Sequence, residues 1–284
     1  MSRSRGAIPL KIPSPVPPLR RIGSRIDLEE IVDSTNGSAF DAATAGAPDG
    51  TVIVAEAQRA GRGRQGRRWE SPSGRNLYLS ILLRGPFPQP VLTGLPFLAA
   101  VAARDAIESH TGLSPRLKWP NDLLLNDRKA GGILVEARSA GGDTVLAVVG
   151  VGLNVNWPVR ALPDALRAVA TSIEIELGRP CDRSALLAEF LARFDRGYGR
   201  LYDEGAGWLL DEWSRRCVTL GRTVAVETAS GPLTGLAEAV EPGGLLRLRH
   251  ADGSVSRLSV EATITLRPDH PQAPTTEAAH ALRH

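Results

Sequence analysis

A chain of 284 residues, 42% of them hydrophobic, can bury a full-sized core and has room for one large domain and a small one. Its formal net charge of +3 is a mild excess of base, so local clusters of charge are more informative than the total. The two cysteines, Cys181 and Cys217, lie outside any CxxC or Cys/His cluster, which excludes a disulfide framework and a structural zinc site and favours a reducing cytoplasm.

Both ends of the chain are predicted to be disordered. Residues 1–22 are rich in Pro, Ser and Arg, and residues 268–284 contain Pro, Thr, Ala and His without periodicity. No apolar run is recognised that could form the core of a signal peptide or cross a bilayer. We therefore expect a cytoplasmic protein without a membrane partner.

The region 23–216 is predicted to be one domain. A strand ends at 31–32, and Asp33-Ser34-Thr35-Asn36 offers side chains that can cap a following helix. Strands follow at 51–57 and 76–83, then an alanine-rich helix at 91–110, strands at 122–125, 130–137 and 144–151, and helices at 183–202 and 207–215. This order predicts an α+β fold, with a mixed or antiparallel sheet under helical cover.

From Cys217 the pattern changes to short β-rich runs, at 218–220, 223–227, 233–239, 245–250 and 255–266. Glycines separate these runs, as in tight turns. Residues 217–267 are therefore predicted to form a second domain, a small β-barrel of SH3-like size.

A segment rich in glycine and arginine, residues 58–69, lies between two predicted strands and reads QRAGRGRQGRRW. Its glycines let the backbone approach a ligand, and its guanidinium groups suit carboxylate and phosphate oxygens. The alternative is an RGG-like tract that contacts RNA without specificity. Such tracts belong to long disordered regions, whereas this segment is short.

Two further segments carry candidate site residues. The first, KWPND at 118–122, is followed by Lys129, which leads into the apolar strand. An ammonium placed there needs an anion, either a ligand or the carboxylate of Asp127 or Asp122. The second, GVGLN at 150–154, has glycines within a strand, which mark either a close approach or a bulge. Neither a Rossmann fingerprint nor a GxxxxGK[ST] phosphate loop is present.

Together, DSTN (33–36), GRGRQGR (61–67), KWPND (118–122), RKAGGIL (128–134) and GVGLN (150–154) resemble the ordered motif set of biotin protein ligases. The resemblance runs from about residue 31 to residue 266, and GRGRQGR and KWPND are its most specific elements. It implies a catalytic domain related to class II synthetase folds and a C-terminal SH3-like domain. It also implies ATP-dependent formation of biotinyl-5′-AMP, followed by transfer of biotin to a lysine of a biotin carboxyl carrier domain.

The resemblance also implies roles for single residues. The expected biotin contacts are Ser34, Thr35, Asn36, Gln58, Arg62, Gly63, Arg64, Lys129 and Gly132. The expected ATP or adenylate contacts are Arg64, Arg67, Trp69, Lys118, Asn121, Lys129 and Asn154. Lys129, Arg64 and Asp122 are the expected catalytic residues, with Asp122 as base or orienting group for the acceptor amine. Asp122 could equally pair with a cation or cap a turn.

This reaction needs preorganised cations, because a carboxylate must attack the α-phosphorus of ATP, and Mg²⁺ would neutralise the departing pyrophosphate. The short segment before Ser34 leaves no room for a winged helix-turn-helix, so no DNA partner is expected. The rivals are a lipoate or octanoate ligase, whose arginine-glycine-histidine pattern is missing, and a non-catalytic nucleic-acid-binding protein. The metal ligands and the choice between monomer and homodimer stay open.

Overall fold

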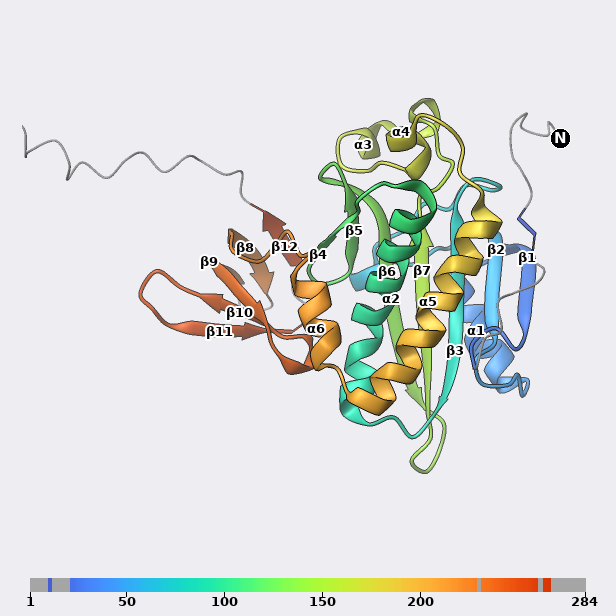
Figure 1. The fold of residues 1–284 in the computed structure, drawn as a ribbon, viewed down its shortest axis with the longest axis horizontal. Helices are drawn as coiled ribbons and strands as arrows, with labels where there is room; N and C mark the ends of the chain where they lie inside the picture. Colours follow the sequence, from blue (N-terminus) through green and yellow to red (C-terminus); the bar gives the residue numbers. More distant parts are fainter. Residues whose placement is uncertain (1–9, 12–20, 229–230, 260–262, 267–284) are drawn as a thin grey trace, which may run out of the picture.

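The computed structural model of the chain describes residues 10–11, 21–228, 231–259 and 263–266 (Figure 1). Its main feature is a seven-stranded sheet in the order β1-β2-β3-β7-β6-β5-β4. The strands are β1 (Ile26–Val32), β2 (Val52–Gln58), β3 (Leu77–Gly85), β4 (Arg116–Lys118), β5 (Asp122–Leu125), β6 (Arg128–Ser139) and β7 (Val145–Leu153). β1 and β2 are parallel and the other neighbours are antiparallel, which confirms the expected mixed sheet.

Helices cover both faces of the sheet (Figure 1). On one face, α2 (Gln89–Thr111) and α5 (Arg183–Glu204) pack together over β3, β7 and β6, and α6 (Gly207–Ser214) packs beside them. On the other face, α1 (Thr35–Thr44) packs through Phe40 on Ile53, Leu82 and Val148. Successive strand residues point to opposite faces, so each strand contributes to both layers. The helical layer over the sheet agrees with the sequence prediction.

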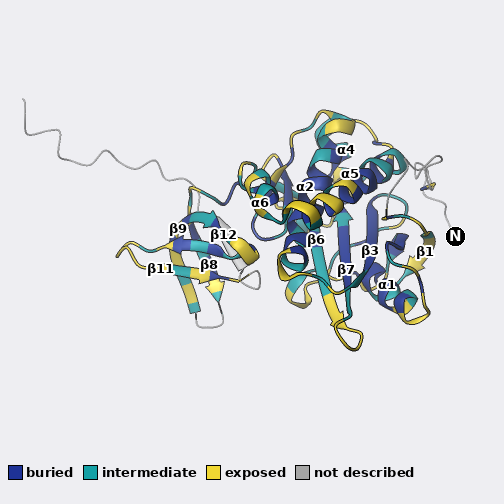
Figure 2. Ribbon diagram, turned by 60° about the horizontal axis from the view of Figure 1, so that its bottom comes forward, coloured by how far each residue is buried: buried dark blue, intermediate teal, exposed yellow. Residues whose placement is uncertain are grey.

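Helix α2 corrects one expectation. It has 23 residues and is long and apolar enough to cross a membrane, although the sequence analysis recognised no such segment. Most of it is buried, however, with 72% of its most apolar window inside the fold (Figure 2). A helix that is apolar on most sides and packed between a sheet and other helices is the core helix of a globular domain.

The C-terminal strands form a second sheet, in the order β11-β10-β9-β8-β12. Its strands are β8 (Thr223–Thr228), β9 (Gly231–Val240), β10 (Leu246–Arg249), β11 (Val255–Leu258) and β12 (Thr263–Leu266). The predicted strand at 218–220 does not form, and the predicted run 255–266 gives two strands. Within the described residues the sheet is open, because β11 and β12 do not pair, so the SH3-like barrel is not confirmed. The boundary at residue 217 stays a prediction.

Several short elements were not predicted. β4 pairs with β5 as an antiparallel hairpin around the KWPND turn. Between β7 and α5 lie a 3-10 turn, Val159–Ala161, and the helices α3 (Asp164–Arg167) and α4 (Ile173–Leu177). These elements have three to five residues each, too few for a hydrophobic pattern to repeat and reveal them.

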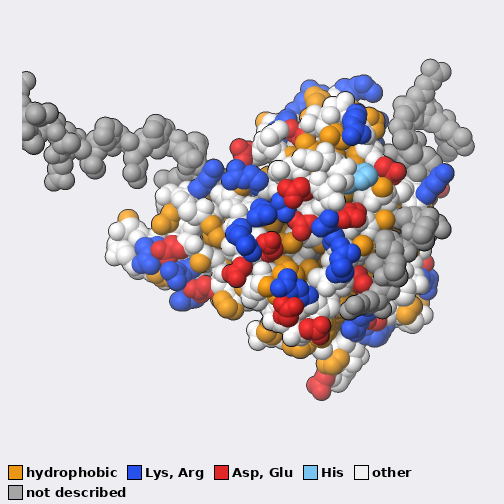
Figure 3. All heavy atoms as spheres, in the orientation of Figure 1, with side chains coloured by type: hydrophobic (Ala, Val, Ile, Leu, Met, Phe, Trp, Pro, Cys, Tyr) orange, Lys and Arg blue, Asp and Glu red, His pale blue; other side chains and the backbone are white. Residues whose placement is uncertain are grey.

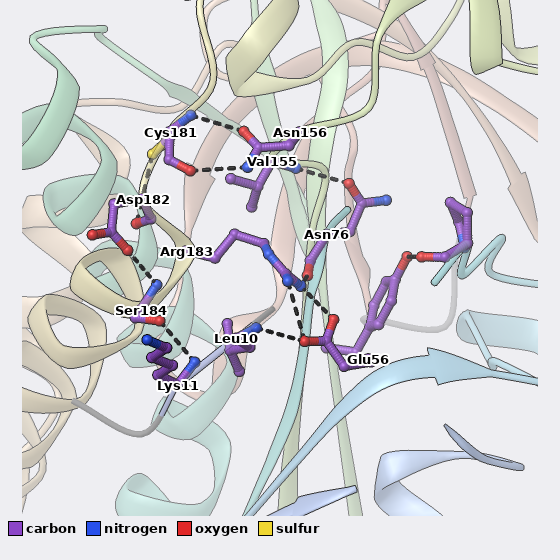
Figure 4. Close-up of polar contacts among 12 residues, drawn as sticks. Leu10, Lys11, Glu56, Asn76, Val155, Asn156, Cys181, Asp182, Arg183 and Ser184 are labelled. Atoms are coloured by element: carbon purple, nitrogen blue, oxygen red, sulfur yellow. Dashed lines mark hydrogen bonds and ion pairs between the residues drawn. The ribbon is translucent and has the colours of Figure 1, made fainter. Parts of the chain in front are cut away.

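Part of the predicted N-terminal tail is packed against the domain, contrary to the expectation of disorder for residues 1–22. Leu10 and Ile22 are buried in the main core. The Leu10 N–H donates to Glu56 Oε1 at 2.6 Å, and Glu56 also pairs with Arg183 at 2.7 Å (Figure 4). Arg183 is the first residue of α5 and its side chain is only 3% exposed, so this ion pair fixes α5 to β2. The tail 268–284 lies outside the described residues.

Acidic and basic side chains alternate on the face drawn in Figure 3, over the helical layer and the C-terminal sheet. On the C-terminal sheet, for example, Glu238 pairs with Arg247 and Arg249. This face carries no field of a single sign, and a surface of this kind does not attract a polyanion.

Candidate active site

The floor of a cavity of about 610 Å³ is the part of the sheet that α1 leaves uncovered. Along β7, Gly150 and Gly152 follow Val148 on the same face. Gly152 pairs with Gly132 of β6, and Gly150 pairs with Leu134. Because these glycines carry no side chain, they leave space above the sheet for a ligand, whereas neighbouring positions on the strands carry side chains of the core. The volume lies within the usual range of small-molecule sites.

One end of the cavity holds a buried network of neutral polar groups. The Thr35 N–H and the Thr35 hydroxyl contact Gln58 Oε1 at 2.9 and 3.3 Å, and Gln58 Nε2 donates to Ser71 Oγ at 2.9 Å. Ser80 Oγ contacts Thr35 Oγ1 at 2.8 Å and donates to Asn36 Oδ1 at 2.6 Å. Donors and acceptors fixed in this way suit a neutral polar ring with both N–H and C=O groups.

The N-terminus of α1 is stabilised differently from the prediction. Ser34 is the N-cap residue, with extended backbone, but its side chain makes no capping hydrogen bond. Instead, Gln58 at the end of β2 accepts from the Thr35 N–H. A helix-terminal donor is thereby connected to a residue of the cavity wall.

The glycine- and arginine-rich segment forms a closed loop beside the cavity. An isolated bridge joins Arg62 to Arg68, and the turn at Arg64–Gly66 places Gln65 at φ 55°. Arg62 pairs with Glu136 Oε2 at 3.2 Å, and Arg64 donates to Asn121 Oδ1 at 3.1 Å. Two guanidinium groups therefore reach different walls of one cavity, and the loop is not an isolated tract.

Lys129 lies at the start of β6. Its ammonium is 2.6 Å from Asp122 Oδ1 and 5.3 Å from the centre of the Trp69 ring. Lys129 therefore has the carboxylate partner that one interpretation expected, and it also lines the cavity, while its contact with a bound anion stays a prediction. Nearby, burial lowers the pKa of Lys118, and the charges of Lys129 and Arg67 lower it further, while Asp122 raises it.

The second end of the cavity is more apolar. Trp69 lies over Gly152, where a Cβ atom would be 2.8 Å from the indole ring. Asn154 Nδ2 donates to Thr171 O at 2.9 Å. Over the described part of the chain, Trp69 Nε1 and Asn154 Oδ1 are buried without a hydrogen-bond partner. One donor and one acceptor in the lining of the cavity are thus left unpaired.

All the site residues predicted from the sequence line this cavity. They are Ser34, Thr35, Asn36, Gln58, Arg62, Gly63, Arg64, Arg67, Trp69, Lys118, Asn121, Asp122, Lys129, Gly132 and Asn154. Their roles toward ligands stay predictions.

Several residues of the site were missed. The apolar end is also lined by Trp157, Leu166 and residues 168–170, from a stretch without periodicity that gave no signal. Glu136, the partner of Arg62 and Asn36, could have been found, because the alternation of β6 places it on the same face as Gly132.

The sequence is similar to a known protein family and to several of its members. The model of the biotin/lipoate A/B protein ligase family matches residues 28–154. The bifunctional ligase/repressor BirA of Bacillus subtilis is 32% identical over 232 residues, which cover 82% of this chain and 71% of that protein. The biotin–[acetyl-CoA-carboxylase] ligase of Paracoccus denitrificans is 33% identical over 228 residues, 78% of this chain and 92% of that protein.

A solved structure is also similar. The biotin protein ligase from Aquifex aeolicus, in complex with biotin and ATP, superposes with a TM-score of 0.74 at 28% identity, and the match covers 86% of this chain and 100% of that one.

Proposed function

The chain belongs to the biotin protein ligases, within the biotin/lipoate A/B protein ligase family, and we propose the division of labour by which its cavity carries out their reaction. The enzyme forms a carbon–nitrogen bond between biotin and a protein, with ATP as the activating substrate. The observation that carries the assignment of roles is the convergence of Arg62, Arg64 and Lys129 on one cavity from two separate segments.

The neutral end of the cavity is assigned to the biotin ring system. Thr35, Asn36 and Gln58 present N–H, O–H and C=O groups there, and Ser34 and Gly132 complete the wall. The ureido group of biotin has two N–H donors and one carbonyl acceptor, so it matches groups of mixed polarity better than charged groups.

The cationic middle of the cavity is assigned to the acyl phosphate. The carboxylate of biotin attacks the α-phosphorus of ATP, pyrophosphate leaves, and the new P–O bond gives biotinyl-5′-AMP. Arg62, Arg64 and Lys129 bring the two anions together, and Arg67 adds charge on the phosphate side. Because Gly63 carries no side chain, the mixed anhydride can lie close to the backbone of the loop, and the loop then excludes water from it.

The apolar end is assigned to the nucleotide. Trp69 and Asn154 offer the unpaired donor and acceptor described above, and Lys118 and Asn121 lie on the path toward the phosphates. Mg²⁺ fits as an ion carried by the ATP phosphates, since Mg²⁺ is usually held by one or two carboxylates together with substrate phosphates. Among the described residues no group of three His, Cys, Asp or Glu side chains is arranged to hold a metal by itself.

In the second half-reaction a lysine amine of the carrier domain attacks the acyl carbon, and AMP leaves. The amine must be deprotonated, and Asp122 is the carboxylate beside Lys129 that can accept the proton. The partner is a biotin carboxyl carrier domain, and the reaction belongs in the reducing cytoplasm, with which two unpaired cysteines agree. A C-terminal SH3-like domain remains part of this proposal.

The test is incubation of the full chain with ATP, Mg²⁺, labelled biotin and a biotin carrier domain. We expect covalent label on the carrier lysine and biotin-dependent release of pyrophosphate. Lipoate or octanoate replaces biotin in a parallel reaction. Label from lipoate but not from biotin would overturn the substrate assignment, and absence of ATP-dependent transfer would overturn the function.

A further inference from the structure

The KWPND segment is a wall of the cavity that is held from the C-terminal side of the molecule. β4 is the edge strand of the large sheet, so beyond β5 it has no further strand of that sheet beside it. The Leu117 N–H donates to Arg216 O at 2.9 Å, and the Val218 N–H donates back to Leu117 O at 2.8 Å. The edge is therefore completed by the connection between α6 and β8, beside the second sheet (Figure 1).

Trp119, which follows Leu117 by two residues, makes two more hydrogen bonds to the C-terminal side. Its backbone N–H donates to Thr219 Oγ1 at 3.0 Å, and its indole Nε1 donates to Gly244 O at 3.0 Å. Trp119 is 1% exposed and Thr219 is fully buried. Gly244 ends the turn between β9 and β10, and this turn packs against α2. Trp119 thus connects the cavity wall to two points on the C-terminal side, one through its backbone N–H and one through its indole.

The residues on both sides of Trp119 belong to the site. Lys118 precedes it, and Asn121 and Asp122 follow it after one proline. Asn121 accepts from Arg64 and donates to Ile133 O at 2.7 Å, and Asp122 pairs with Lys129. A displacement of Trp119 therefore moves the partners of the arginine and the lysine that would act on the acyl phosphate.

We propose that Trp119 is a positioning residue, through which Thr219 and Gly244 hold Asn121 and Asp122 in register with Arg64 and Lys129. Trp119 also lines the cavity, but its indole N–H donates to Gly244 O and is not free to bind a substrate. The proposal rests on the ligase function described above. It makes the C-terminal sheet part of the catalytic geometry rather than an appended module, because errors of about 1 Å at reacting groups can cost about 100-fold in rate.

The chain supplies a matched control. Trp213 is a second tryptophan of 1% exposure, and its indole Nε1 has no hydrogen-bond partner among the residues that the structure describes. Trp119→Phe and Trp213→Phe remove the same atoms from buried sites, but only the first breaks a hydrogen bond to the C-terminal sheet. Thr219→Val and Thr219→Ser form a second pair, since valine removes the acceptor and serine keeps it.

Each full-length variant is assayed for biotin-dependent pyrophosphate release at saturating ATP, well below its melting temperature. For Trp119→Phe and Thr219→Val we expect kcat to fall about tenfold or more and the KM for biotin to change by a smaller factor, because Thr35 and Gln58, which are assigned to the biotin ring, belong to other elements. Trp213→Phe and Thr219→Ser should keep kcat within about threefold of wild type.

The inference is overturned if Trp119→Phe and Trp213→Phe lose kcat equally, or if Thr219→Ser falls as far as Thr219→Val. It is also overturned if kcat stays at the wild-type value in both Trp119→Phe and Thr219→Val. Should Trp119→Phe not fold, the Thr219 pair decides. A wild-type chain that releases no pyrophosphate with biotin would instead refute the ligase function, so the two failures are distinguishable.

Discussion

Gly150→Ala tests whether the floor of the cavity depends on a missing side chain. A Cβ atom on Gly150 would lie 2.2 Å from Asn36 Oδ1 and 3.0 Å from Asn36 Cγ. Asn36 is 3% exposed and cannot turn away freely, since it accepts from Ser80 at 2.6 Å and donates to Glu136 at 2.7 Å. Either these hydrogen bonds break or the strands move apart.

The cost follows from the contacts that are lost. A neutral hydrogen bond contributes about 1 kcal/mol and one to a carboxylate about 1.5–3 kcal/mol, so breaking both lowers the free energy of unfolding by about 2.5–4 kcal/mol. If the backbone moves instead, overpacking costs about 1–3 kcal/mol. We therefore expect Gly150→Ala to lower the free energy of unfolding by about 1–4 kcal/mol and to weaken biotin binding, because Thr35 and Gln58 belong to the same network.

Urea unfolding measures the first effect and titration calorimetry with biotin the second. Gly37→Ala is the matched control, since it lies beside Asn36 in α1 and its Cβ would meet only Ser34 Cβ at 3.9 Å. Alanine should raise the stability of this helix by up to about 1 kcal/mol. If Gly150→Ala unfolds at the wild-type urea midpoint and binds biotin with wild-type affinity, Asn36 is not held as described.

Three further predictions concern other parts of the molecule. Asp122→Asn should slow transfer of biotin from preformed biotinyl-5′-AMP to the carrier domain by about 100-fold or more if Asp122 is the base, and an unaltered single-turnover rate would remove that role. Lys118→Met should raise stability at neutral pH, because burial lowers the pKa of Lys118 below its usual 10.5 in the folded chain. The unfolded chain then binds more protons just below pH 10.5, so wild-type stability rises with pH in that window and the advantage of the methionine shrinks; an advantage that grows toward pH 10 in urea titrations would contradict this. Within α5, Gly197→Ala should destabilise the fold, since its Cβ would lie 2.4 Å from Leu98 Cδ1. At the exposed position of Gly199 the added Cβ has open space, so Gly199→Ala should stabilise the fold by about 0.5–1 kcal/mol. Equal melting temperatures of the two variants would refute the packing described for α2 and α5.

The sequence predicted elements whose pattern is long enough to repeat. The helix at 91–110 and the strand at 122–125 were placed to within a few residues, because apolar periodicity reports directly which face is buried. Glycines in the strand at 150–154 indicated either a close approach or a bulge, and the structure shows a close approach, of Asn36 to Gly150 and of Trp69 to Gly152. Site residues could therefore be predicted where a single strand or a single loop carries them.

Contacts between segments that are distant in the sequence could not be predicted. Nothing in the sequence near Trp119 indicates that its indole donates to Gly244, since this contact depends on the packing of the second sheet. The strand β4 was missed because its three residues pair with β5 and with residue 217, and short strands are defined by their partners. The burial of Leu10 was missed for a similar reason, because a composition rich in proline and serine does not reveal one apolar anchor.

The ion pairs of this fold differ in how readily an anionic ligand could replace the carboxylate partner. The difference follows from how far each pair is buried. Arg183 and Glu56, behind the sheet, have side chains only 3% and 16% exposed, and breaking such a pair leaves a buried charge. In the cavity, Lys129 and Asp122 are 35% and 22% exposed, and Arg62 with Glu136 is similarly accessible. Pairs near solvent contribute about 1 kcal/mol or less, so an anionic ligand can replace the carboxylate at little cost. Under the proposed assignment, Lys129 and Arg62 are paired with carboxylates before the acyl phosphate forms and can then exchange these partners for it.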